Sequence, residues 1–217
     1  EVNAPLLAEA SAHRPDTVQP NSAQIEEELW RDADLVFPVS TNLAQRVQAV
    51  RKHARGVFVH SNGVDPQLFP KKKNDNTQDQ TINLAFLGHP KPWHGFSVLP
   101  RLIQILAGDQ EVHLTIIGGG PGAEWIKNEM TELGLSDMLT ITGPLPQREA
   151  INQLQSCQFS IAPYLASSSF YFCPLKVLES MAAGIPTIST RCGDIPQLTQ
   201  GHAILCDNNS PEEIAQK

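Results

Sequence analysis

The sequence has few cysteines and no long apolar run. Its four cysteines, Cys157, Cys173, Cys192 and Cys206, include no CxxC pair and have no neighbouring histidine at metal-ligand spacing. This pattern argues against a zinc site or a disulfide framework, and it suits small buried hydrophobes in a reducing compartment. No stretch approaches the ~20 apolar residues that a membrane-spanning helix needs. We therefore expect a cytoplasmic location and no bound metal.

Basic side chains are also scarce. The 217 residues carry 16 Lys and Arg against 23 Asp and Glu, which gives a formal charge of −7. This balance argues against a nucleic-acid partner, because phosphate backbones need clustered Lys and Arg. The basic run Lys71-Lys72-Lys73 lies beside polar residues and is typical of a solvated linker. A membrane-contacting patch is the alternative interpretation of that run.

The sequence does contain enough apolar residues for a core, since 41% of it is hydrophobic. The apolar runs form two blocks, residues 1–65 and residues 81–217, separated by a polar stretch without periodicity at 66–80. We predict a partial domain, an interdomain linker and a larger domain. The chain starts abruptly at Glu1 without a methionine, and we expect it to be part of a longer protein.

The first block mixes helical and extended patterns. Helical periodicity covers residues 22–31 and 43–50, with Thr41-Asn42 as the N-cap region of the second helix. Strand-like apolar runs cover residues 33–40 and 56–60.

The second block alternates between short β-branched runs and segments of helical periodicity. Predicted strands cover residues 82–87, 112–117, 139–142, 159–162, 187–189 and 203–205. Predicted helices cover residues 96–106, 123–133, 148–155, 174–183, 195–198 and 211–217. This alternation predicts an α/β fold with a doubly wound, Rossmann-like parallel sheet covered on both faces. Ligands bind such sheets at the carboxyl ends of the strands.

The loops after the predicted strands favour an anionic ligand with two phosphates. The first of these loops carries His89, Lys91 and His94. The next two contain small or backbone-accessible residues: Gly119, Gly120, Gly143, Pro144 and Leu145. Cationic side chains, glycines and helix starts at one sheet edge are what phosphates require.

Pro174 opens the most informative helix. A proline suits the first helical position, which leaves the amides of Leu175, Lys176 and Val177 as unpaired donors at the positive end of the helix dipole. Lys176 adds a full charge, and the carboxylate of Glu179 can accept two ribose hydroxyls. An exposed Lys-Glu pair on a helix surface is an equally good interpretation of the spacing alone.

A dinucleotide site is the rival interpretation of the glycine loop, because Gly118, Gly120 and Ala123 fit G-x-G-x-x-A. That motif also needs an acidic residue after the next strand, to hold the ribose. The strand at 139–142 instead ends in Gly143-Pro144. The requirement fails, which argues against NAD or FAD.

The order of these motifs resembles the C-terminal domain of family 4 (group 1) retaining glycosyltransferases of the GT-B fold. The matching segments are FLGHPKPWHG (86–95), LTIIGGGP (114–121), ITGPL (141–145), FCPLKVLESMAAGIP (172–186) and TRCGDI (190–195). Residues 1–5, 33–40 and 60–65 resemble the last third of the N-terminal, acceptor-side domain of that family. The resemblance implies that part of each domain lies outside this chain.

The resemblance also implies roles for individual residues. Glu179 is expected to bind the donor ribose, the helix start at Leu175 and Lys176 to meet the diphosphate, and the loop at 143–145 to meet the nucleobase. The family's usual Arg and Lys of the first loop align with His89 and His94, so charge neutralisation shifts to Lys91 or to a protonated His94. The usual first glutamate is replaced by Tyr171.

The function that follows is transfer of a sugar, with retention and without a metal, from a UDP-sugar or GDP-sugar to an unknown acceptor. Asn3 is a candidate contact for sugar or acceptor, or a turn residue. We expect these 217 residues alone to be inactive. Two alternatives are a sugar-nucleotide epimerase on the same fold and a non-catalytic interaction module.

Overall fold

The computed structural model describes residues 1–13, 16, 18–70, 81–166 and 170–217. Contacts divide the chain into two compact units. The first contains the described residues of Glu1–Gly63 and Ser167–Cys173, and the second those of Val64–Ala166 and Pro174–Lys217. The second unit is therefore interrupted by a short segment that packs in the first.

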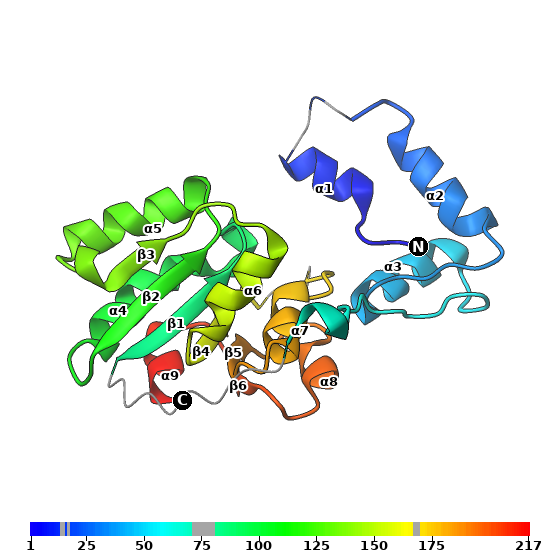
Figure 1. Ribbon diagram of the computed structural model, residues 1–217. Coiled ribbons are helices and arrows are strands. Elements are labelled where there is room, and N and C mark those ends of the chain that lie inside the picture. The colour runs from blue at the N-terminus through cyan, green and yellow to red at the C-terminus, as the bar shows by residue number, and fades with distance from the viewer. Residues whose placement is uncertain (14–15, 17, 71–80, 167–169) are drawn as a thin grey trace. The chain divides into compact units, whose positions relative to one another are not determined.

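The second unit is built on a parallel six-stranded sheet in the order β3-β2-β1-β4-β5-β6 (Figure 1). Its strands are β1 (Ile82–Leu87), β2 (Val112–Ile117), β3 (Leu139–Ile141), β4 (Phe159–Ala162), β5 (Thr187–Thr190) and β6 (Ile204–Cys206). Its α-helices are α4 (Leu99–Leu106), α5 (Pro121–Glu132), α6 (Gln147–Gln155), α7 (Leu175–Ala182), α8 (Ile195–Thr199) and α9 (Pro211–Gln216). Its 3₁₀ turns are η2 (Pro66–Leu68), η3 (Pro92–His94), η4 (Phe96–Val98) and η5 (Ser136–Met138).

Helices cover both faces of this sheet. One core joins Phe86 of β1 and Ile116 of β2 to α4, α5 and α9. The other joins the next residues along the same strands, Leu87 and Ile117, to α6 and the residues after α7. Successive side chains of a strand point to opposite faces, so strands buried on both faces need continuous apolar runs. The predicted doubly wound α/β fold is confirmed.

The first unit contains α1 (Leu6–His13), α2 (Ser22–Asp32) and α3 (Thr41–Arg51). The Ser40 hydroxyl caps α3 by accepting a hydrogen bond from the Leu43 amide at 3.2 Å. The guanidinium of Arg51 donates to the carbonyl oxygens of Trp30 and Ala33 at 2.5 and 2.8 Å, which satisfies acceptors at the end of α2.

Most predicted elements of the second unit lie within one or two residues of the observed ones. The helix predicted at 96–106 is the exception, because residues 96–98 form η4 and α4 starts at Leu99. The other differences lie in the first unit. The helix α1 was not predicted, and the extended runs at 33–40 and 56–60 form only single parallel bridges, Val2 to Pro38 and Val36 to Val57. The cap of α3 is Ser40 rather than Thr41-Asn42.

The predicted linker is structured where it is described. Residues 66–68 form η2, and Phe69 is buried in the core beside α6. Residues 71–80, which include the basic run, lie outside the described residues.

Candidate functional site

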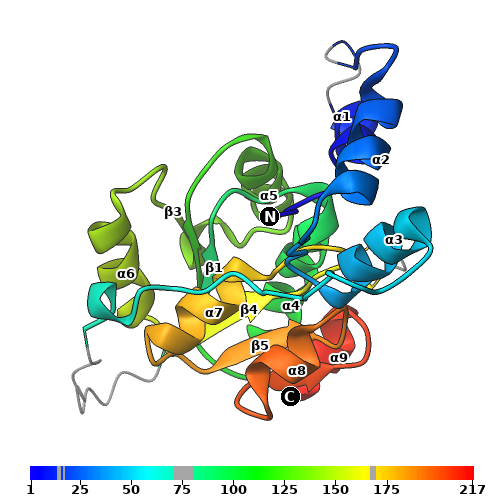
Figure 2. The same ribbon diagram turned by 90° about the vertical axis from the view of Figure 1, so that its right-hand side faces the viewer.

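The sheet reverses its winding between β1 and β4. From β1 the chain runs outward through β2 to β3, and from β4 it runs the opposite way through β5 to β6. The loops that leave the carboxyl ends of β1 and β4 therefore diverge, and ligands of doubly wound sheets bind at this switch point. The helix α7, which follows β4, lies beside β4 and β5 (Figure 2).

Four side chains from the two diverging segments meet at the switch point. The ammonium nitrogen of Lys176 lies 4.1 Å from the centre of the Phe86 ring and 5.6 Å from that of Tyr164. The imidazole of His94 contacts the same two rings, with centroid distances of 6.2 Å to Phe86 and 5.7 Å to Tyr164. We call these four residues the switch-point cluster.

Close backbone packing holds this cluster together. The amide of Leu165 donates to the carbonyl oxygen of Trp93 at 3.3 Å, which joins the loop after β4 to the loop after β1. Gly95 has φ +66°, and a Cβ there would lie 1.9 Å from the carbonyl oxygen of Pro163. Only glycine allows this approach.

Lys176 is buried without a hydrogen-bond acceptor. Its Nζ atom is inaccessible to solvent and has no hydrogen-bond partner among the residues that the structure describes. Burial lowers the pKa of Lys176 from its ordinary 10.5 to about 7, and the carboxylate of Glu179 opposes this shift. An unpaired buried cation is costly, so this nitrogen is prepared to receive an anion. The sequence located Lys176, but neither its burial nor its aromatic neighbours.

The pKa of His94 is lowered to about 3, first by burial and then by the nearby charge of Lys176. Its Nδ1 lies 3.2 Å from both the Lys91 amide nitrogen and the His89 carbonyl oxygen. The expectation of a protonated His94 was therefore wrong for the ligand-free state, because the residue is neutral at physiological pH.

His89 holds the glycine loop. Its Nδ1 lies 2.6 Å from the carbonyl oxygen of Gly119 and 3.3 Å from the amide nitrogen of the same residue. The next loop is equally close, because the Gly118 amide donates to the Thr142 hydroxyl at 3.2 Å, and that hydroxyl donates to the Gly143 carbonyl at 2.8 Å. The loops with Gly119-Gly120 and with 143–145 thus lie side by side at the sheet edge.

The start of α7 differs from the expectation. Pro174 is the residue before the helix, and the amide of Val177 donates to the Pro174 carbonyl oxygen at 2.9 Å. Val177 was predicted to offer an unpaired amide, and this was wrong because that amide closes the first turn. The amides of Leu175 and Lys176 precede this bond and remain the candidate donors.

Glu179 lies one turn beyond Lys176 and lines a cavity of about 30 Å³ together with Leu87 and Gln147. Burial raises its pKa, while the charge of Lys176 opposes the rise. The glutamate is thus half-buried near α6, which starts just after the loop at 143–145. Lys91, by contrast, is exposed.

Asn3 and Tyr171 belong to the first unit. The phenol of Tyr171 donates to the Glu9 carboxylate at 3.2 Å, and the guanidinium of Arg46 lies 5.7 Å from its ring centre. Burial, and then the nearby Glu9 carboxylate, raise the pKa of Tyr171 to about 12, so it stays protonated. Its contacts are structural ones within the first unit.

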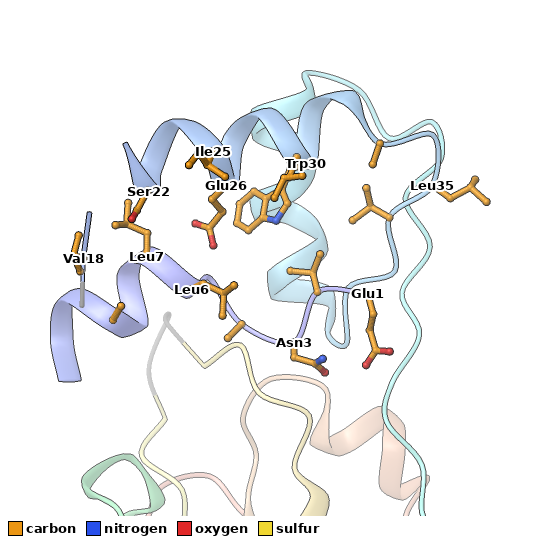
Figure 3. A pocket seen from close by; sticks show the side chains of 16 residues that line it. Glu1, Asn3, Leu6, Leu7, Val18, Ser22, Ile25, Glu26, Trp30 and Leu35 are labelled. Atoms are coloured by element: carbon orange, nitrogen blue, oxygen red, sulfur yellow. The ribbon is translucent and has the colours of Figure 1, made fainter. Parts of the chain in front are cut away.

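The first unit also contains a cavity of about 610 Å³ between α1 and α2 (Figure 3). Asn3, Leu6, Ile25 and Trp30 line it, and Glu26 has a buried carboxylate oxygen without a hydrogen-bond partner among the described residues. The residues described as lining this cavity include no Lys, Arg or His. The cavity therefore offers no cationic side chain to bind a diphosphate.

Neither a metal centre nor a membrane span is found in the part of the chain that the structure describes. No three His, Cys, Asp or Glu side chains gather there at ion-binding distance. The Asp-x-Asp pattern Asp32-Ala33-Asp34 lies at the end of α2 and just after it, with both aspartates exposed. None of the described helices is long and apolar enough to cross a bilayer.

The winding order of the sheet defines an α/β protein, and it resembles solved glycosyltransferases of the GT-B fold. More particularly, the chain belongs to the glycosyl transferases of group 1, whose family profile matches residues 81–217.

The chain resembles several curated and solved proteins. It is 25% identical over 197 residues to the putative colanic acid biosynthesis glycosyltransferase WcaL of Escherichia coli (strain K12), covering 88% of this chain and 48% of WcaL. It thus spans about half the length of the curated relatives it matches. HepE from Anabaena, solved with UDP and glucose, superposes with a TM-score of 0.73 at 17% identity over 93% of this chain and 57% of HepE. Sucrose-phosphate synthase from Thermosynechococcus elongatus gives a TM-score of 0.73 at 17% identity, over 97% of this chain and 54% of its own.

Proposed function

We propose that the full-length protein transfers a sugar from a nucleoside diphosphate sugar to an acceptor, with retention of configuration and without a metal ion. The observation that carries this proposal is the buried ammonium of Lys176, which has no hydrogen-bond partner among the described residues and lies where β1 and β4 diverge. The group 1 family membership and the UDP and glucose bound by HepE support the choice of ligand.

In this proposal the diphosphate lies against the start of α7. The Lys176 ammonium and the amides of Leu175 and Lys176 bind its oxygens, and the glycine loop at Gly119-Gly120 lets the ligand approach the backbone. Glu179 accepts hydrogen bonds from the ribose, and the loop at 143–145 meets the base.

Catalysis then rests on stabilising the leaving group. Negative charge grows on the diphosphate as its bond to the sugar breaks, and a preorganised cation with fixed amide dipoles stabilises that charge in a site shielded from water. The acceptor is held by residues outside the second unit. Because the chain spans about half of its relatives, we propose that these residues alone do not turn over.

Calorimetric titration of the full-length protein with UDP-glucose and GDP-mannose tests the site. We expect Lys176→Met and Glu179→Ala to weaken binding of the preferred donor about tenfold or more, as the loss of a charged hydrogen bond does. Lys127→Met, which changes an exposed lysine of α5, is the matched control. Equal affinities in all four proteins would reject the site. The anomeric configuration of the product, determined by NMR with and without EDTA, tests retention and metal independence.

A further inference from the structure

The switch-point cluster holds Lys176 in a way that suits two charge states. An ammonium group needs acceptors for its three N–H bonds, and the nitrogen of Lys176 has none among the described residues. The face of Phe86 at 4.1 Å attracts a cation, but it replaces only part of the lost hydration. A neutral amine is accommodated on the same ring with a much smaller desolvation penalty.

The groups around Lys176 have opposing effects on its pKa. His94 faces it from η3 and is neutral, since its own pKa is lowered to about 3. Lys91, on the same loop, lowers the pKa of His94 and so adds positive potential to the cluster. Tyr164 contributes its ring from the loop after β4. On α7 itself, Glu179 favours the charged amine. Burial exceeds this attraction, so the pKa of Lys176 is about 7.

We propose that Lys176 takes up a proton from solvent when the donor diphosphate binds, so that the free site holds part of its amine in the neutral form and becomes fully cationic only with its ligand present. This inference rests on the proposed function of the site. The two negative charges of the diphosphate supply both the acceptors and the potential that the empty cluster lacks. The proton binds the amine lone pair, and no other bond changes. Lys176 thereby gains its charge next to the group that becomes more negative during transfer.

Calorimetry of the full-length protein with UDP-glucose at pH 7, in PIPES, HEPES and Tris, measures this uptake. Both phosphates of UDP-glucose are esterified, so its own charge is constant near neutrality. With a pKa of about 7 in the free protein, we expect uptake of about half a proton per bound nucleotide. The affinity should fall about fiftyfold between pH 7 and pH 9, because only the protonated fraction is competent to bind.

Variants separate Lys176 from its neighbours. Lys176→Arg keeps the charge at every pH, so binding should release or take up no proton and the affinity should be flat from pH 7 to pH 9. Lys127→Arg, on the exposed face of α5, should behave as wild type. His94→Gln should retain the uptake.

Two results would overturn the inference while leaving the proposed site intact. One is UDP-glucose binding by the wild-type protein with a heat that is the same in all three buffers. The other is an uptake that persists in Lys176→Arg and disappears in His94→Gln, which would assign the proton to the imidazole. Failure of the wild-type protein to bind UDP-glucose or GDP-mannose at all would instead reject the proposed function, and this inference with it. The pH series uses the wild-type protein alone. It therefore tests the inference even if one of the variants does not fold.

Discussion

The Nδ1 atom of His89 lies 2.6 Å from the carbonyl oxygen of Gly119, so the loop after β1 is tied directly to the loop after β2. These loops form one side of the proposed diphosphate site. A histidine at this place therefore positions the backbone of the glycine loop, and its substitution should affect the ligand through that loop.

We expect His89→Leu to weaken UDP-glucose binding by about fivefold, since one hydrogen bond of roughly 1 kcal/mol no longer holds the loop in its binding conformation. His89→Gln, whose amide can still donate to the Gly119 carbonyl, should recover most of the affinity. Titration calorimetry measures both. A charge-neutralising role for His89 would instead leave both variants equally impaired.

Two adjacent glycines should respond differently to alanine. Gly118 has φ +147°, and a Cβ there would lie 2.6 Å from the Gly88 carbonyl oxygen, so Gly118→Ala should lower the free energy of unfolding by roughly 3 kcal/mol. At Gly119 the nearest atoms would be 3.5 Å and 3.7 Å away, so Gly119→Ala should cost less than ~1 kcal/mol. Urea denaturation of both variants compares them. Similar losses would show that the loop relaxes around a side chain at Gly118.

The buried Lys176 should make the protein more stable at alkaline pH. The pKa of Lys176 is about 7 in the folded state, against an ordinary 10.5. Between pH 7 and pH 10.5 the unfolded chain therefore holds a proton that the folded chain has released. Stability therefore rises with pH across this window, by on the order of 4 kcal/mol. The Lys176→Met variant should lack this rise. Urea denaturation from pH 7 to pH 10 measures the difference, and parallel curves for the two proteins would contradict the burial of a titrating amine.

His94 should contribute to acid sensitivity. Its pKa falls from 6.5 to about 3 on folding, so its contribution is complete above pH 6.5 and is lost as the pH drops toward 3. We expect His94→Gln to lose less stability than wild type between pH 6.5 and pH 4. Thermal unfolding followed by circular dichroism measures this, with His202→Gln, an exposed histidine after α8, as the control. Identical acid curves for wild type and His94→Gln would mean that the imidazole is not buried.

The strands of the second unit could be predicted because most are short runs of apolar and β-branched residues between helical segments. Runs such as residues 82–87 and 112–117 form strands that are buried on both faces. Such strands need apolar residues on both sides, so their local composition is enough to predict them. The first unit was less predictable. Its extended segments at 33–40 and 56–60 pair only through single bridges, so strand propensity there is not matched by a sheet.

The sequence placed the candidate site residues on their loops and helices, but it could not predict their burial or charge. Lys176 was placed at the start of a helix correctly, whereas its burial depends on Phe86, which is ninety positions earlier on a neighbouring strand. The resemblance implied charge on Lys91 or on a protonated His94, whereas burial and then the nearby charge of Lys176 lower the pKa of His94 to about 3. Sequence reasoning did not single out Phe86 or Tyr164. Tyr164, directly after the predicted strand at 159–162, was the available signal.

The short segment before α7 limits how this protein can be dissected. The Ser40 hydroxyl donates to the Tyr171 carbonyl at 2.7 Å, and the Tyr171 phenol contacts Glu9, so these residues complete the first unit although they come between two parts of the second. A shortened chain that starts at residue 64 would retain the whole sheet but would leave Tyr171 without those partners. Exchange of the second unit between relatives therefore has to keep this segment together with α1 and α3.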